Sequence, residues 1–327
     1  MQKLQIWSEP PDSKYSELYL TRALLQSAGF HFMPDPKYMV IAGPTGIGKT
    51  DLAFELAQRL RTEIIGADAF QVYRGLDVLT GKPTPLQLGA INHHLIGCVP
   101  LTDAFDAHQY AVLARQAILT ANQRETIPLV VGGTGFYIHA LEKPLPRLPS
   151  ASKALRSKFE QQSTPALLKE LALRDAVAFE RIDRQNRRRV IRALEVCLIS
   201  GRPFSSFATD SSPDPSIPRF FLERSREELI ERINRRVVQM FAQGVVEEVA
   251  AVKEIGPTAT RAIGFSLIRS LLAGEIDENT CRALICQQTR QCAKRQTTWF
   301  RRQPYECIAA ESSIERLLAA FRRRFGR

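Results

Sequence analysis

The residues with the clearest chemistry form one glycine-rich segment, Gly43-Pro44-Thr45-Gly46-Ile47-Gly48-Lys49-Thr50, which matches the pattern G-x-x-x-x-G-K-[ST]. Such glycines let backbone N–H groups turn toward phosphate oxygens, and the start of the following helix adds partial positive charge. Lys49 supplies a mobile cation, and the hydroxyl of Thr50 can ligate Mg²⁺. A chance turn is disfavoured because an apolar run precedes the segment and an amphipathic stretch follows it. The segment predicts a di- or triphosphate site and leaves the chemistry open.

Two further polar residues follow apolar runs. Asp68 comes after Ile64–Ala67, and Thr134 lies in Gly132-Gly133-Thr134-Gly135. Because the carboxyl ends of parallel strands meet at one edge of a sheet, we expect both near the phosphate loop. A carboxylate there can act as a general base or hold a metal-bound water, and the threonine hydroxyl can donate to a phosphate. A helix cap and a plain tight turn are the alternative interpretations.

Basic residues gather in two groups in the second half of the chain. The groups are Arg181, Arg184, Arg187, Arg188, Arg189 and Arg192, then Arg290, Lys294, Arg295, Arg301 and Arg302. On a helix, Arg290, Lys294, Thr298 and Arg301 share one stripe, beside Trp299 and Phe300. Cations with neighbouring aromatic rings suit a nucleic-acid backbone and an unstacked base. The alternative is a solvated helix face above core aromatics.

Charge is unevenly distributed along the 327 residues. Residues 141–327 carry 34 basic and 22 acidic side chains, so the net charge of +11 arises entirely there. This asymmetry favours a polyanionic partner. The 44% hydrophobic and 24% charged composition is globular and excludes a mainly disordered, collagen-like or coiled-coil protein. No apolar run is long enough to predict a membrane-spanning helix.

The cysteines indicate a reducing compartment. None of the six forms a C-x-x-C pair, and no Cys/His set has zinc spacing. Residues 1–37 lack the positive start and apolar core of a secretory signal. We therefore expect a cytoplasmic protein that does not contact membranes.

The order of apolar runs and amphipathic stretches predicts an α/β fold: a P-loop NTPase-like parallel sheet core with helices on both faces, plus a small all-helical insertion lobe. Strands are expected at 39–42, 64–68, 94–99, 128–133 and 219–222. Helices are expected at about 106–121 and 186–200, and through most of 225–302. The expected domains are an N-terminal extension (1–37), the first part of the core (38–150), the lobe (151–185), the rest of the core (186–302) and a basic tail (303–327).

Together these segments resemble the tRNA dimethylallyltransferase family. Besides residues 43–50, the resemblance is carried by Gly66–Gly75, Thr80–Pro83, His93–Ile96, Val131–Tyr137, Arg189–Val196, Arg261–Phe265 and Thr289–Arg301. It runs in order and at family-like spacing from about residue 38 to residue 302. The family transfers a dimethylallyl group from its diphosphate to the exocyclic N6 of the adenosine just 3′ of certain tRNA anticodons. Diphosphate is released, and Mg²⁺ is required.

The resemblance implies a role for each site residue. Asp68 is the base, Thr134 binds near the diphosphate and the nucleotide, Arg236 assists the leaving group, and Thr50 holds Mg²⁺. The lobe grips the anticodon stem, and the enzyme is a monomer. The implied tRNA-binding residues are Asp68, Ala69, Phe70, Gln71, Arg156, Arg188, Arg189, Arg192, Arg261, Gly264, Arg290, Lys294, Arg295, Gln296, Trp299 and Arg301.

The chain departs from the family pattern in places. Ala69 stands where a serine usually follows the aspartate, and Gly97 replaces a common aspartate. Residues 1–37 exceed the usual leader, and no zinc-finger set follows residue 307.

Three other functions compete. An adenylate isopentenyltransferase shares the phosphate loop and the aspartate but does not need the basic second half. A P-loop small-molecule kinase would use ATP, and its lid and acceptor motifs are not evident. A non-catalytic RNA-binding protein is disfavoured by intact Lys49, Thr50 and Asp68.

Overall fold

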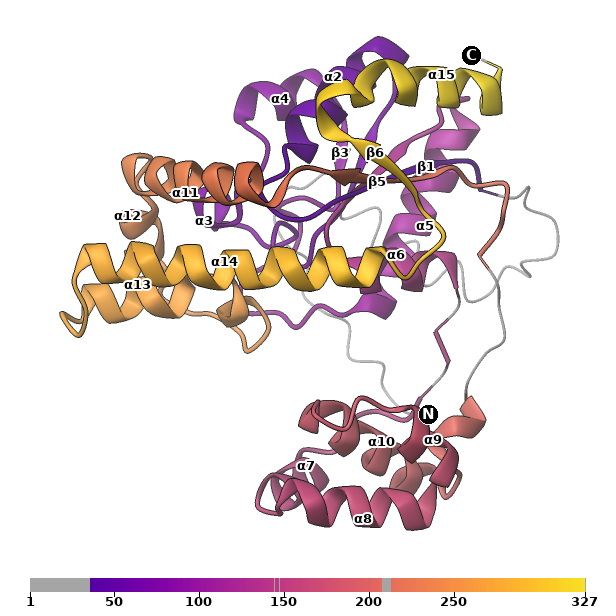
Figure 1. Ribbon diagram of the computed structural model, residues 1–327, viewed down its shortest axis with the longest axis vertical. Coiled ribbons are helices and arrows are strands. Elements are labelled where there is room, and N and C mark those ends of the chain that lie inside the picture. The colour runs from indigo at the N-terminus through magenta and orange to yellow at the C-terminus, as the bar shows by residue number, and fades with distance from the viewer. Residues whose placement is uncertain (1–35, 144, 147, 208–212, 327) are drawn as a thin grey trace, which may run out of the picture. The chain divides into compact units, whose positions relative to one another are not determined.

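The computed structural model describes residues 36–143, 145–146, 148–207 and 213–326 (Figure 1). Within them the chain forms two compact units. The larger unit contains the described residues up to Glu142 and those from Asp214 onward, and the smaller unit lies between Lys143 and Pro213. Except for its last two residues, the expected extension 1–37 lies outside the described part.

The larger unit is built on a parallel sheet. Within the described residues the sheet has six strands in the order β3-β2-β4-β1-β5-β6, and all of their pairings are parallel. This confirms the predicted α/β fold. The strands are β1 (Met39–Ala42), β2 (Ile64–Ala67), β3 (His93–His94), β4 (Leu129–Gly132), β5 (Arg219–Glu223) and β6 (Glu306–Ala309).

Helices follow most of the strands. Those of the larger unit are α2 (Lys49–Leu60), α3 (Asp77–Thr80), α4 (Pro85–Ala90), α5 (Ala107–Gln123), α6 (Gly135–Glu142), α11 (Arg226–Ala242), α12 (Val245–Ala250), η2 (Ala259–Arg261), α13 (Phe265–Leu272), α14 (Glu278–Phe300), η3 (Ala310–Ser312) and α15 (Ser313–Phe325). Those of the smaller unit are α7 (Lys153–Glu160), α8 (Thr164–Arg174), α9 (Ala176–Arg181), α10 (Arg187–Ser200) and η1 (Phe204–Phe207). Among the described residues, no helix has both the length and the apolar character needed to cross a bilayer.

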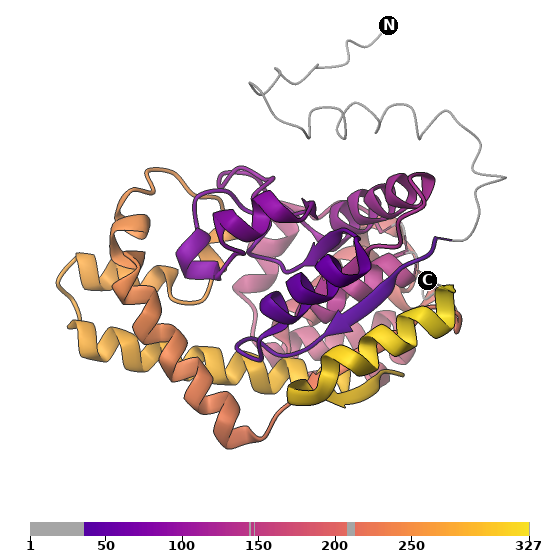
Figure 2. The ribbon, with the colours of Figure 1, turned by 90° about the horizontal axis from the view of Figure 1, so that it is seen from above.

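The central strands are buried on both faces, as their continuous apolar sequences require. On one face, Met39 and Ile41 of β1 pack in a cluster with apolar residues of α2 and α15. On the other face, Phe221 of β5 stacks on Phe300 of α14, with ring centroids 5.2 Å apart. Helices α5 and α6 also contact β2, so the core lies in layers on either side of the sheet (Figures 1 and 2).

The C-terminal segment differs from the expected basic tail. Strand β6 pairs with β5, and α15 buries Leu317, Leu318 and Phe321 in the core. The apolar residues of α15 repeat at helical spacing between its arginines, so burial of that face outweighs the basic character of the segment.

The expected lobe boundary at residue 185 also differs. Helix α10, which was expected in the core, lies in the smaller unit. Its Val190, Ile191 and Leu194 form a core cluster with Phe159 of α7 and with apolar residues of α8. The lobe cannot close its own core without α10, so the unit extends beyond the predicted 151–185.

The predicted strand at 94–99 is also shorter than expected. Only His93 and His94 belong to β3. Leu95 and Gly97 adopt φ angles of 61° and 60°, in the left-handed region, which breaks strand geometry immediately after β3.

Glu63, just before β2, holds a polar cluster at the amino end of the sheet. Its carboxylate accepts hydrogen bonds from His94 at 2.6 Å, from Arg124 at 2.6 Å and from Asn92 at 3.0 Å. Burial by itself raises the pKa of Glu63, but the bonds from His94 and Arg124 outweigh it and lower the pKa to about 2.

Glu63→Gln is expected to lower the free energy of unfolding by about 2 kcal/mol near neutral pH, because it removes charge-assisted hydrogen bonds. The pKa of Glu63 is lower in the folded state than in the unfolded state. Its contribution is therefore complete above about pH 5 and is lost as the pH falls toward about 2. Urea unfolding of both proteins at about pH 7 and about pH 3.5 measures this; an equal difference at both values would contradict it.

Candidate active site

The carboxyl ends of β1, β2 and β4 meet at one edge of the sheet. The strand β4 lies between the other two, and Gly132 is in register with both Ala42 and Ala67. A Cβ at Gly132 would collide with the carbonyl of Ala67, so only glycine permits this approach. The structure thereby brings together the phosphate loop, Asp68 and Thr134.

The loop 43–50 has the conformation of a phosphate cradle. Gly46 and Gly48 have φ angles of 83° and 98°, which L side chains rarely adopt. The helix α2 begins at Lys49, directly after the loop. The ammonium of Lys49 donates to the carbonyl oxygens of Gly43 and Pro44, each at 2.9 Å. The cation therefore lies against the carbonyls of its own loop.

The pKa of Lys49 is lowered to about 8. Burial is the largest influence and lowers it, the Asp68 carboxylate raises it, and the Arg236 guanidinium lowers it. A bound anion next to the ammonium would favour the protonated form.

We expect pyrophosphate affinity to fall above about pH 8, approaching tenfold per pH unit, because the free protein then loses the Lys49 proton that binding requires. Titration calorimetry across this range measures the effect. Lys49→Arg is the control: its guanidinium stays charged, so its affinity should show no such fall beyond that of the ligand itself. Parallel profiles for the two proteins would rule out Lys49 as the titrating group.

Asp68 is held by the backbone that follows it. Its Oδ1 accepts the N–H groups of Phe70 at 2.9 Å and of Gln71 at 3.2 Å. Within the described part of the chain, Oδ2 has no hydrogen-bond donor. The carboxylate is thus fixed in orientation while one oxygen remains able to accept a proton.

Thr134 joins the turn after β4 to the Asp68 loop. Its N–H donates to the carbonyl of Ala67 at 3.1 Å. Its Oγ1 accepts the N–H of Ala69 at 3.0 Å, which leaves the hydroxyl proton able to donate to a ligand. The backbone N–H makes this contact, so it does not depend on the side chain at position 69.

Arg236 of α11 lies beside the phosphate loop. It donates to Oγ1 of Thr45 at 3.3 Å and to the carbonyl of Thr80 at 3.0 Å. Burial lowers its pKa, and the Asp68 carboxylate opposes that shift. A guanidinium with this little hydration is well placed to stabilise an anion.

Two more arginines hold carbonyls of the loop, and neither was among the predicted site residues. Arg232 donates to the carbonyl of Gly46 at 3.0 Å, and Arg224 donates to that of Ile47 at 3.2 Å. These two contacts hold the backbone of the loop at Gly46 and Ile47. The spacing of Arg232 and Arg236, four residues apart on a helix, is the one signal that points to a shared face.

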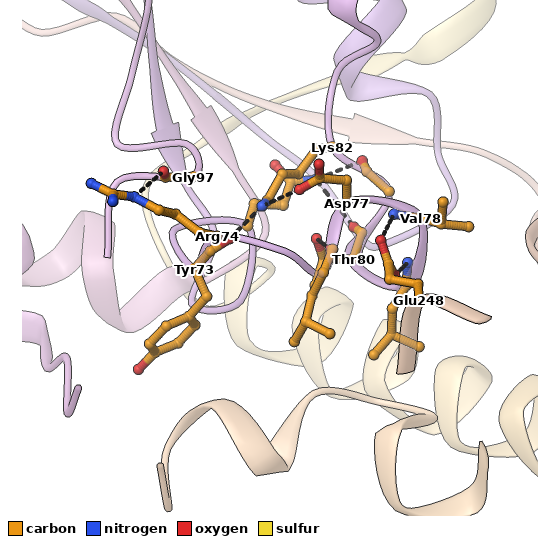
Figure 3. Close-up of polar contacts among 12 residues, drawn as sticks. Tyr73, Arg74, Asp77, Val78, Thr80, Lys82, Gly97 and Glu248 are labelled. Atoms are coloured by element: carbon orange, nitrogen blue, oxygen red, sulfur yellow. Dashed lines mark hydrogen bonds and ion pairs between the residues drawn. The ribbon is translucent and has the colours of Figure 1, made fainter. Parts of the chain in front are cut away.

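Glu248 and Lys82 hold the segment that precedes α4 (Figure 3). Glu248 of α12 accepts the N–H groups of Val78 and Leu79, each at 2.8 Å, at the start of α3. Lys82 donates to the carbonyl of Tyr73. These contacts fix Thr80, whose carbonyl receives Arg236.

The implied tRNA-binding residues of α14 fall into two groups. Lys294 and Arg295 are exposed, whereas Gln296 and Trp299 are half-buried against the sheet edge. Gln296 accepts the N–H of Thr45 at 2.8 Å and donates to Gly133 at 2.9 Å.

The other implied residues near α14 differ in their exposure. Arg290 donates to Asn234 at 3.3 Å, and Arg301, just beyond the helix, pairs with Glu223 at 2.9 Å. Arg261 is exposed and Gly264 is buried. The predicted stripe therefore mixes residues that have protein partners with the exposed Lys294.

In the smaller unit, two of the implied residues have structural partners. The buried carboxylate of Glu195 pairs with Arg156 at 3.0 Å and with Arg192 at 3.7 Å. Arg192 also donates to the carbonyl of Pro149 at 2.7 Å. Arg188 and Arg189 are exposed at the start of α10.

The oxygen donors of the site suit Mg²⁺. No cluster of three or more His, Cys, Asp or Glu side chains that could hold a metal occurs among the residues that the structure describes. Mg²⁺ is commonly held by one or two protein oxygens together with substrate phosphates. The Thr50 hydroxyl, in the first turn of α2 beside the phosphate loop, fits that arrangement.

A phosphate loop at the switch point of a parallel sheet, facing a carboxylate, defines a P-loop enzyme that acts on a phosphorylated substrate. The family model described as IPP transferase matches residues 71–303. The chain belongs to the IPP transferase family, which confirms the predicted resemblance.

Similar proteins carry names of the same family. The tRNA dimethylallyltransferase of Akkermansia muciniphila is 37% identical over 283 residues, covering 86% of this chain and 96% of the relative. The tRNA dimethylallyltransferase 1 of Trichlorobacter lovleyi is 41% identical over 281 residues, covering 82% and 92%.

Solved structures share the fold. The tRNA delta(2)-isopentenylpyrophosphate transferase of Staphylococcus epidermidis is 29% identical, with a TM-score of 0.64 over 89% of this chain and 100% of that one. A eukaryotic dimethylallyltransferase acting on tRNA, 24% identical, gives a TM-score of 0.72 over 89% and 77%, and supports the fold alone.

Proposed function

We propose that the protein is a tRNA dimethylallyltransferase, which transfers a dimethylallyl group to N6 of the adenosine just 3′ of the anticodon. The observation that carries the proposal is the convergence of Lys49, Arg236 and Asp68 at one sheet edge, in a chain that belongs to this family. Two cations there can receive a departing diphosphate, and one carboxylate can receive a proton.

The leaving group is stabilised by fixed charge. The loop N–H groups, Lys49 and Arg236 offset the negative charge that develops on the diphosphate as the bond between the allylic carbon and oxygen breaks. The ammonium of Lys49 is held at the phosphate loop by the carbonyls of Gly43 and Pro44, so it is close to the expected position of the diphosphate.

The acceptor amine attacks the allylic carbon, which carries cationic character. The new carbon–nitrogen bond forms as the carbon–oxygen bond breaks, and the surplus N6 proton passes to Asp68. Thr134 keeps the Asp68 loop against β4, so the base stays close to the diphosphate site. Mg²⁺, held by Thr50, would add further neutralisation of the diphosphate when bound.

The tRNA is bound by exposed cations. Arg188 and Arg189 in the smaller unit and Arg261, Lys294 and Arg295 in the larger unit are available to backbone phosphates. The target adenosine must leave its stack to reach the site, as for other enzymes that act on a base.

Lys294→Ala is expected to weaken tRNA binding and to reduce the slope of log affinity against log salt concentration by about 0.7–0.9, as loss of one phosphate contact predicts. Filter binding at several salt concentrations measures the slope. Arg316→Ala, an exposed arginine of α15 paired with Glu306, is the matched control and should leave the slope unchanged. Equal slopes for both variants would show that Lys294 does not contact a phosphate of the tRNA.

The choice of acceptor tests the function against its nearest alternative. Purified protein is given dimethylallyl diphosphate with either an unmodified tRNA anticodon stem-loop or AMP. The proposal predicts prenylated RNA and little prenylated AMP. Preference for AMP would instead indicate an adenylate isopentenyltransferase.

A further inference from the structure

The side chain of Gln296 spans two segments of the active-site edge. Its Oε1 accepts the N–H of Thr45 at 2.8 Å, and its Nε2 donates to the carbonyl of Gly133 at 2.9 Å. Thr45 belongs to the phosphate loop, and Gly133 belongs to the turn that carries Thr134. One amide group therefore joins the loop to the turn.

The chain is shaped to admit this contact. A Cβ at Gly133 would lie 2.6 Å from Nε2 of Gln296, and a Cβ at Gly135 would collide with the indole of Trp299. These glycines let α14 lie directly on the turn. Phe300 anchors the end of the helix by stacking on Phe221, with centroids 5.2 Å apart. Gln296 is thus supplied by a helix that is fixed to the sheet.

The hydrogen bonds of Gln296 continue through Thr134 to the loop of Asp68, the proposed general base. Thr134, next to Gly133, accepts the N–H of Ala69, which follows Asp68. Thr45 is held a second time through its hydroxyl, by Arg236. Gln296 is therefore linked directly to the phosphate loop and, through the turn of Gly133 and Thr134, to the loop of Asp68.

We propose that Gln296 is a positioning residue for the diphosphate loop and not a contact for tRNA. This inference rests on the proposed function. Holding the Thr45 peptide fixes the direction of the loop that follows it, and so the distance between the diphosphate and Asp68. Small errors in that distance cost catalysis heavily. The exposed neighbours Lys294 and Arg295 carry the contact with RNA instead.

Two substitutions test the two hydrogen bonds of Gln296. Gln296→Ala removes both hydrogen bonds. Gln296→Glu keeps the length and the acceptor for Thr45, but places a carboxylate oxygen against the Gly133 carbonyl and near the diphosphate. We expect each to weaken binding of inorganic pyrophosphate about tenfold or more, with Glu the worse. Affinity for tRNA is expected to stay at the wild-type value.

Titration calorimetry with pyrophosphate and filter binding with tRNA provide the two readouts. The control is Gln287→Ala, an exposed glutamine of α14, which should keep both affinities. Thermal unfolding shows whether each variant is folded. A folded Gln296→Ala with weakened pyrophosphate binding supports the inference, because this variant adds no charge. Where the alanine variant is unstable, Gln296→Met, which keeps the length without either hydrogen bond, takes its place.

Wild-type pyrophosphate affinity in Gln296→Glu would overturn the inference, and so would loss of tRNA affinity alone in either variant. Failure of the proposed function looks different. A wild-type protein that binds pyrophosphate but transfers no dimethylallyl group to tRNA contradicts the function, and the comparison of pyrophosphate affinities still decides the role of Gln296.

Discussion

Lys49→Ala is expected to reduce kcat/KM for dimethylallyl diphosphate by about 10²–10³-fold, the usual cost of losing one charge-stabilising donor. The ammonium that now lies on the Gly43 and Pro44 carbonyls would no longer be available to the leaving oxygens. The alanine side chain also cannot make the two hydrogen bonds that Lys49 donates to the loop. Steady-state kinetics with saturating tRNA measures the loss.

Affinity for tRNA should not change in this variant, because Lys49 contacts the loop and not the exposed basic surface. Lys37→Ala, an exposed lysine outside the site, is the matched control. Turnover within a few-fold of wild type in Lys49→Ala would show that the phosphate loop does not bind the reacting diphosphate.

Asp68→Asn is expected to lower kcat by about 10²–10⁴-fold, the range for loss of a general base. The amide oxygen can still accept the N–H groups of Phe70 and Gln71, so the loop should keep its shape. What the variant loses is an oxygen able to take the N6 proton. Single-turnover measurements with bound tRNA isolate this chemical step.

Binding provides the second readout for Asp68. Affinities for tRNA and pyrophosphate should stay close to wild type, and Asp103→Asn, an exposed aspartate away from the strand ends, should behave as wild type throughout. A single-turnover rate close to wild type in Asp68→Asn would show that Asp68 is not the general base.

Local patterns predicted the parts of the site that lie at strand ends. The phosphate loop is specified by eight consecutive residues. Asp68 and Thr134 follow from one rule, that parallel strands deliver their carboxyl ends to one edge. The register of Gly132 with Ala42 and Ala67 is the physical form of that rule.

Long-range contacts were not predictable in the same way. Arg224 and Arg232 act on carbonyls of residues more than 170 positions earlier, which depends on how β5 and α11 pack beside the loop. The arginines of α15 led to the prediction of a basic tail. The helix joins the core instead, because Leu317 and Phe321 are buried there. The buried ion pairs of Glu195 were not predicted, because its partners Arg156 and Arg192 were expected to contact RNA.

The stoichiometry of the reaction tests the central claim most directly. Purified protein is incubated with unmodified tRNA, Mg²⁺ and dimethylallyl diphosphate, and separately with ATP in place of the isoprenoid. The account predicts one pyrophosphate released for each N6-dimethylallyladenosine found by mass spectrometry of the digested tRNA, and no ADP from ATP. Consumption of ATP with no allyl group on any RNA would contradict it.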